Sequence, residues 1–138
     1  MKYRSCTTAD ITQCVKLFDL PELVTANGVG VNAPYLVKFI NEKYFLVAED
    51  KGKIVGALYG EKLKAGGTMM WALAVDSNYQ GKGIGTKLMK MFEKNARLDK
   101  RKWIVLHAST KTERTVNFYR KLGYDIGNKY VECAKDLV

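Results

Sequence analysis

The strongest constraint on the fold is a glycine cluster between an apolar run and an amphipathic segment. The run "MMWALAV" covers residues 69–75, and "QGKGIG" follows at residues 80–85. From residue 84 to residue 96, apolar side chains recur at helical spacing. Glycine inside a helix costs roughly 0.5–1 kcal/mol relative to alanine. Glycines at a helix start therefore indicate a need for bare backbone, and we predict a buried strand, a glycine turn and a helix in succession.

A helix N-terminus offers about four unpaired N–H groups and roughly half a positive charge. A turn without side chains lets an anion reach those groups, and Lys82 adds a charge, so the unit is suited to a phosphate. The alternative is a turn that only lets strand and helix pack closely. Neither common nucleotide loop matches, because Gly85-Thr86-Lys87 has the wrong order for a Walker loop and Thr86 and Leu88 break the dinucleotide pattern.

Periodicity and turn residues predict the other elements. Thr7 with Asp10 predicts a capping box, Asn32 and Pro34 a helix start, and Gly123 a helix end. We predict an α/β fold with a mixed, mostly antiparallel sheet of about six strands and about four helices. The strands are expected at 2–7, at 69–75, at 102–109, within 128–137 and as a hairpin at 44–63; the helices are expected at 8–18, 32–41, 84–96 and 112–122.

Composition indicates one domain over residues 1–138, since the chain has 138 residues and 47% of them are apolar. No apolar run approaches the roughly 18 residues of a membrane span, and the N-terminus lacks a signal-peptide core. An odd number of cysteines, three, without metal-type spacing favours reduced thiols and a cytoplasmic location. With a single histidine, no metal site is expected.

Two motifs resemble those of the GNAT superfamily of N-acetyltransferases. Gln80, Gly83 and Gly85 match its acyl-CoA signature, Q/R-x-x-G-x-G/A. "TERTVNFYRKLGY" is similar to its second motif, with Phe118 and Tyr119 followed by Gly123 and Tyr124. The order of elements also matches over nearly the whole chain. The resemblance implies a GNAT-like domain that moves an acetyl group from acetyl-CoA to a primary amine.

The resemblance also implies site residues. In this family the CoA pyrophosphate rests on the glycine turn, and the pantetheine arm pairs with the edge of the fourth strand. The backbone N–H near Val75 would stabilise the oxyanion, and Tyr119 is the expected general acid. Thr112 stands where relatives often have a CoA-contacting Asn. The cofactor-binding positions are therefore Leu73, Ala74, Val75, Gln80, Gly81, Lys82, Gly83, Ile84, Gly85, Thr86 and Thr112.

The general base is not identified, because the position near Met69, where many relatives carry Glu, holds no carboxylate. The remaining candidates are Glu49, Glu61, Asp76, His107 and a water relay. An α-amine, with a pKa near 8, is more often neutral at pH 7 than a lysine amine. This favours a peptide α-amine or a small amine metabolite. The net charge of +9 repels cations, so it disfavours polyamines and favours an amine with an anionic group. The acceptor is expected beside residues 20–36.

The net charge leaves two other functions open. One is nucleic-acid binding, which is disfavoured because no nucleic-acid motif is present. The other is a module that binds acyl-CoA without transferring the acyl group. A homodimer is expected from the family resemblance. The basic residues cluster at Lys94, Arg97, Lys100, Arg101 and Lys102, and again at Lys111, Arg114, Arg120 and Lys121.

Overall fold

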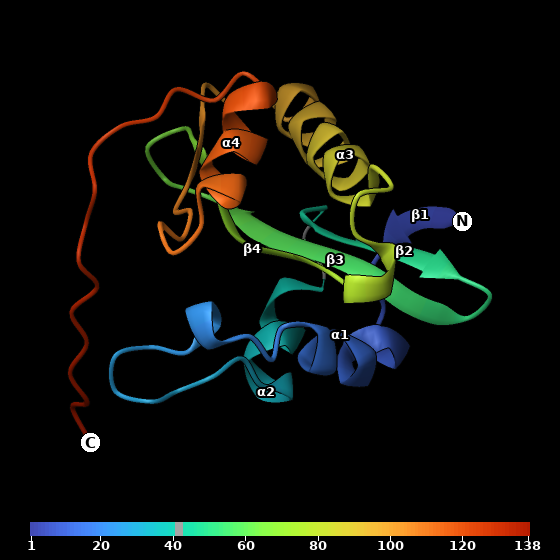
Figure 1. The fold of residues 1–138 in the computed structure, drawn as a ribbon, viewed down its shortest axis with the longest axis horizontal. Coiled ribbons are helices and arrows are strands. Elements are labelled where there is room, and N and C mark those ends of the chain that lie inside the picture. The colour runs from blue at the N-terminus through green and yellow to red at the C-terminus, as the bar shows by residue number, and fades with distance from the viewer. Residues whose placement is uncertain (41–42) are drawn as a thin grey trace.

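The computed structural model describes residues 1–40 and 43–138. Five strands form one sheet in the order β1-β2-β3-β4-β5, in which only the β4–β5 pair is parallel. Helices α3 and α4 cover one face of this sheet and α1 and α2 cover the other (Figure 1). The strands are β1 (Lys2–Ser5), β2 (Phe45–Asp50), β3 (Lys53–Lys62), β4 (Thr68–Val75) and β5 (Ile104–Leu106); the helices are α1 (Ile11–Leu17), α2 (Ala33–Leu36), α3 (Ile84–Leu98) and α4 (Glu113–Lys121).

The core has two halves, one on each face of the sheet. Phe18 of the α1 side packs on the ring of Tyr59 from β3, with centroids 5.2 Å apart. On the α3 side, Tyr44 packs on Phe92, also at 5.2 Å. Strands β2 and β3 are therefore apolar on both faces, as expected of interior strands.

Local signals place most of the elements as predicted. Thr7 and Asp10 form the capping box, although the first turn is a 3-10 helix before α1 begins. The Asn32 side chain accepts a hydrogen bond from the Tyr35 N–H at 3.0 Å and so caps α2. The α2 helix is shorter than predicted, and a 3-10 turn, Val37–Phe39, continues it; Asn41, the predicted end, lies outside the described residues.

One predicted strand is not formed. Residues 128–137 have no secondary structure, and Tyr130 and Val131 are 78% and 87% exposed. Strand β5 is only three residues long, so it offers this segment little edge to pair with. The segment instead contacts the loop after α1 through polar groups: Glu132 accepts from the Ala26 N–H, and Asp136 accepts from the Asn27 amide at 2.6 Å.

We expect the ion pair between β1 and α1 to stabilise the fold. Arg4 Nη1 lies 2.6 Å from Asp10 Oδ2, and this contact, with hydrogen bonds from Thr7, lowers the pKa of the buried Asp10 to about 2. Because the unfolded pKa is about 3.9, the stabilisation is present above pH 4 and is lost as pH falls toward 2. Asp10→Asn should therefore lower the free energy of unfolding by about 2 kcal/mol at pH 7.

Urea denaturation at several pH values measures this effect, with the exposed Asp19→Asn as the control. The difference between Asp10→Asn and the wild type should shrink between pH 4 and pH 2. A difference that stays constant across this range would show that the Asp10 charge is not what stabilises the fold.

Candidate active site

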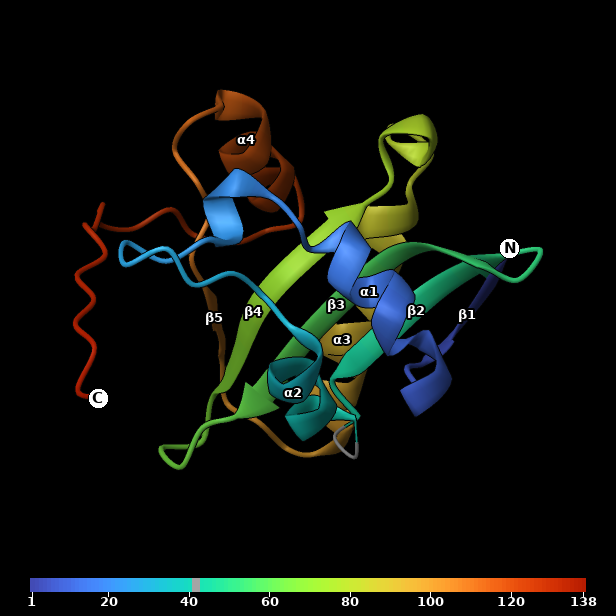
Figure 2. The same ribbon diagram turned by 90° about the horizontal axis from the view of Figure 1, so that it is seen from below.

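The sheet opens between β4 and β5. Strand β5 pairs only with Thr68, Met69 and Met70 of β4, and the last pair is Met70 with Leu106. Beyond that point β4 continues to Val75 while β5 diverges from it toward α4 (Figure 2). The strand predicted at 102–109 is therefore reduced to three residues, because the chain turns away from β4 after the pair between Met70 and Leu106.

The backbone of β4 exposes donors along this open edge. The Asp76 N–H donates to the Val55 carbonyl of β3 at 2.9 Å. Backbone groups alternate in direction along a strand, so the N–H of Ala74 also points toward β3. Leu73 and Val75 consequently direct their N–H groups away from β3. The Gln80 amide confirms this direction, since it donates to the Val75 carbonyl at 3.1 Å.

The glycine turn leads directly from this edge into α3. Gly81 and Gly83 have φ values of +76° and +79°, which L side chains rarely adopt, and no atom lies within 4 Å of a Cβ built on either. Gly83 is the N-cap of α3 and provides no side-chain cap. The first helical bond runs from the Lys87 N–H to the Gly83 carbonyl at 3.0 Å. The N–H groups of residues 84–86 therefore precede the hydrogen-bonded turns and are free to bind an anion.

Three elements converge beside Gly85. A Cβ at this position would lie 3.4 Å from the Phe118 ring of α4 and 3.6 Å from the Leu73 side chain of β4. Lys82 folds back on the turn, with its ammonium 5.0 Å from the centre of the Tyr79 ring. The strand edge, the turn and α4 thus meet beside Gly85, where the sequence motifs predict the cosubstrate site.

Helix α4 contributes Tyr119 and its capping residue Thr112. Tyr119 is 7% exposed, and its ring packs against Phe118 and Tyr124. Burial raises the pKa of Tyr119 to about 12, so its hydroxyl carries a proton at neutral pH and can donate it. Thr112 lies at the N-terminus of α4, where its hydroxyl oxygen is 3.1 Å from that of Thr115.

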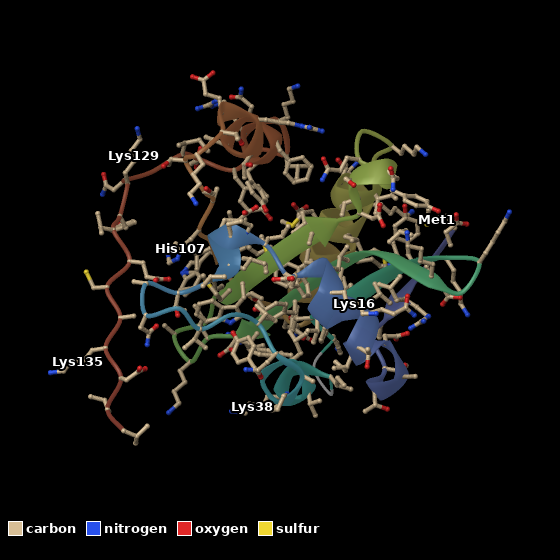
Figure 3. The ribbon with its side chains drawn as sticks, turned by 60° about the horizontal axis from the view of Figure 1, so that its bottom comes forward. Met1, Lys16, Lys38, His107, Lys129 and Lys135 are labelled. Carbon is tan, nitrogen blue, oxygen red and sulfur yellow. The ribbon has the colours of Figure 1, made fainter. Side chains whose placement is uncertain are left out.

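The candidate bases have different environments. Glu49 forms an ion pair with Arg4, and Asp76 pairs with Lys53 while accepting from the Asn78 N–H, so both carboxylates have structural roles. His107 directly follows β5 and lies on the side of the molecule that faces the C-terminal segment (Figure 3), with its ring 6.2 Å from Tyr130. Glu61 lies at the end of β3 and accepts a hydrogen bond from the Trp71 indole at 3.0 Å.

No sequence pattern predicts the contact between Glu61 and Trp71. The contact depends on a bulge in β4. The bulge results from how β3 and β4 pair, and this pairing leaves no local signal in the sequence. Among the described residues, no group of three or more His, Cys, Asp or Glu side chains is arranged to hold a metal ion. No helix in that part of the chain is long and apolar enough to cross a membrane.

Part of the basic surface is used within the fold. The Arg101 guanidinium donates to the carbonyl oxygens of Leu63 and Gly67, and so fixes the turn between β3 and β4. Arg97 lies 3.7 Å from Glu93 on α3, and Arg120 donates to Asn117 on α4. Two of the five cations at the end of α3, Arg97 and Arg101, therefore have partners within the fold, and both border a groove of about 280 Å³ together with Lys102.

The chain matches known proteins over most of its length. The family model described as "Acetyltransferase (GNAT) domain" matches residues 41–126. PaiA N-acetyltransferase from Thermoplasma acidophilum, solved with coenzyme A, is 17% identical, with a TM-score of 0.80 over 95% of this chain and 93% of that chain. Arabidopsis thaliana Naa50, in complex with the bisubstrate analogue CoA-Ac-MVNAL, is 23% identical, with a TM-score of 0.74 over 96% and 90%.

An aminoglycoside acetyltransferase from an uncultured soil metagenomic sample, solved with trehalose, is 25% identical. Its TM-score is 0.72, over 99% of this chain and 96% of that chain. At these identities the structural likeness to PaiA and Naa50 establishes the fold, and the family model establishes the family. The α/β fold and the family predicted from the two motifs are both confirmed.

We predict that the two glycines flanking the start of α3 differ in their tolerance of a side chain. Gly83→Ala should lower the free energy of unfolding by about 1 kcal/mol, because its φ of +79° is strained for alanine. Gly85→Ala should be neutral or slightly stabilising, because Gly85 is helical and its Cβ would meet neighbours at ordinary contact distance. Urea denaturation measures both, and equal losses would contradict the assigned backbone conformation.

Proposed function

The chain belongs to the GNAT acetyltransferase family, and on that premise we propose that it transfers an acetyl group from acetyl-CoA to a primary amine by direct attack. The observation that carries this proposal is that the open edge of β4 continues directly into the glycine turn at the start of α3. The open edge of β4 offers N–H groups at Leu73 and Val75, and the strand then runs into a bare turn and the uncapped start of α3. A ligand with an extended amide-bearing arm and a phosphate end fits both features.

The positions that would hold acetyl-CoA have distinct tasks. The turn from Gln80 to Thr86 binds the pyrophosphate, and Lys82 adds a positive charge after moving from the Tyr79 ring. The edge of β4 at Leu73–Val75 aligns the pantetheine arm. We assign to Thr112, at the start of α4, a hydrogen bond from its hydroxyl to the cosubstrate.

The reaction forms one C–N bond and breaks one C–S bond. Acetyl-CoA supplies the activated acetyl group, and the neutral amine attacks its carbonyl carbon. The backbone N–H near Val75 stabilises the oxyanion, and Tyr119 gives its proton to the departing sulfur. The nitrogen releases its extra proton to water, and Tyr119 regains a proton from water, so one proton moves in total from the amine to the thiol. A thiol has a pKa near 8.5, so the thiolate is already a fair leaving group and Tyr119 assists the step without being indispensable.

The similar structures support this assignment through their ligands. The PaiA structure contains coenzyme A, and the Naa50 structure contains an analogue that joins CoA to a peptide. We extend the domain over residues 1–138, since the structural matches run well beyond residues 41–126. The acceptor class is a peptide α-amine or a small amine metabolite.

Calorimetric titration should detect stoichiometric, micromolar binding of acetyl-CoA and no comparable binding of ATP or NADH. The reason is that the open edge of β4 recognises an amide-bearing arm, which the two nucleotides lack. Gly83→Val should weaken acetyl-CoA binding, since its side chain would stand in the open space beside the turn. Equal affinity for ATP would mean that the site recognises only phosphate charge.

Tyr119→Phe should lower kcat by about ten- to a hundredfold and leave the affinity for acetyl-CoA nearly unchanged, because it removes only the proton donor. Tyr124→Phe is the matched control, since its hydroxyl donates to Glu93 at 3.1 Å. Steady-state kinetics with a mixed set of amines measures both variants. Acetyl-CoA binding without turnover in the wild type would instead indicate a non-catalytic acyl-CoA-binding protein.

A further inference from the structure

A β-bulge places an exposed tryptophan where the sheet opens. Tyr59 pairs with Ala72 and Gly60 pairs with Met70, so Trp71 is an extra residue on β4. It follows Met70, the last β4 residue paired with β5. Its side chain is 40% exposed, and its indole N–H donates to Glu61 Oε2 at 3.0 Å. The bulge therefore presents an aromatic ring and a carboxylate together at the open edge.

The Glu61 carboxylate lies on the face of the sheet covered by α1 and α2. The preceding Gly60 faces α3, because a Cβ there would lie 2.7 Å from the Phe92 ring. Side chains alternate along a strand, so Glu61 shares the opposite face with Tyr59. The Tyr59 ring lies 5.9 Å from that of Tyr35 on α2, which is 36% exposed. Aromatic rings from β3, β4 and α2 thus lie along the face that carries Glu61.

Within the described parts of the chain, neither Glu61 nor Asp50 of β2 forms an ion pair with a lysine or arginine. Asp50 accepts a hydrogen bond from the Tyr79 hydroxyl, but Glu61 alone of the two lies at the bulge beside the open edge of β4. Asp10 and Glu49 pair with Arg4, and Asp76 pairs with Lys53. The Trp71 indole orients one oxygen of Glu61, which leaves its negative charge without a cationic partner.

A carboxylate beside exposed aromatic rings is suited to an ammonium group. The carboxylate accepts charge-assisted hydrogen bonds, and the faces of tryptophan and tyrosine attract cations. This ammonium cannot be the reacting amine, since the attacking nitrogen must be neutral. Trp71 precedes Val75, near which the oxyanion would be held, by four residues, or about 13 Å along a strand. The Trp71 and Glu61 side chains, together with a second amine several bonds from the first, would span that distance.

We infer that Glu61, oriented by Trp71, binds a second ammonium group on the acceptor, which makes the preferred substrate a small diamine or polyamine. This inference rests on the proposed acetyltransferase function and narrows its acceptor class. It opposes the preference for anionic amines that the net charge of +9 favours. The local contact outweighs the distant charges, because salt screens exposed charges beyond about 8 Å at physiological ionic strength.

Three amines of the same carbon-chain length test this inference at saturating acetyl-CoA. Putrescine carries a second ammonium group, butylamine carries none, and γ-aminobutyrate carries a carboxylate. The wild type should show a kcat/KM for putrescine about ten- to a hundredfold above that for butylamine, the range expected for a hydrogen bond to a charged group. The difference should lie mainly in KM and should decrease as salt is added.

Glu61→Gln should bring the putrescine-to-butylamine ratio close to one, and Trp71→Phe should reduce it partially by removing the indole donor. Asp19→Asn, which changes an exposed carboxylate that follows α1 on the same side of the sheet, is the matched control and should keep the wild-type ratio. A ratio near one in the wild type, an unchanged ratio in Glu61→Gln, or a preference for γ-aminobutyrate would overturn the inference.

Calorimetry with acetyl-CoA separates this inference from the function on which it rests. If the wild type binds acetyl-CoA but acetylates putrescine and butylamine with the same kcat/KM, only the role of Glu61 is overturned. Binding without turnover of any of the three amines would also overturn that role, while leaving the cosubstrate site in place. If the wild type does not bind acetyl-CoA, both the proposed function and the inference are wrong.

Discussion

The candidate site depends on the loss of pairing between β4 and β5 after Met70. Backbone N–H groups inside a sheet normally have partners, and leaving them unpaired is unfavourable where water is excluded. The bulge at Trp71 and the divergence of β5 leave the N–H groups of Leu73 and Val75 without strand partners. An extended ligand can satisfy them, so the same interruption that weakens the sheet creates its binding edge.

The glycine turn connects this edge to the positive end of the α3 helix dipole. Strand β4 leads through the turn into α3, so the exposed N–H groups of the strand and those of the helix start belong to one continuous segment. Positive φ values at Gly81 and Gly83 turn the chain into α3, and Gly83, the N-cap residue, has no side chain with which to cap the helix. The favourable end of the helix dipole is therefore available to an anion, and the strand beside it to an extended arm.

The net charge of the whole protein is a poor guide to the charge at any one binding site. Several of its cations have internal roles: Arg4 joins β1 to α1, and Arg101 fixes the turn after β3. Meanwhile Glu61 retains a carboxylate without a cationic partner among the described residues. Salt limits the range of interactions between exposed charges to about a Debye length. Recognition of an acceptor therefore depends more on these local contacts than on the total charge of the surface.

The sequence by itself determined the family, the strand–turn–helix unit, the helix caps and the residues around the glycine turn. These features rest on local patterns: glycines that permit left-handed backbone, capping residues and the spacing of apolar side chains. The tertiary structure decided the length of β5, the failure of residues 128–137 to form a strand, and the bulge that joins Trp71 to Glu61. Those features depend on which strands lie side by side and where their pairing stops, and no short stretch of sequence encodes contacts between distant segments.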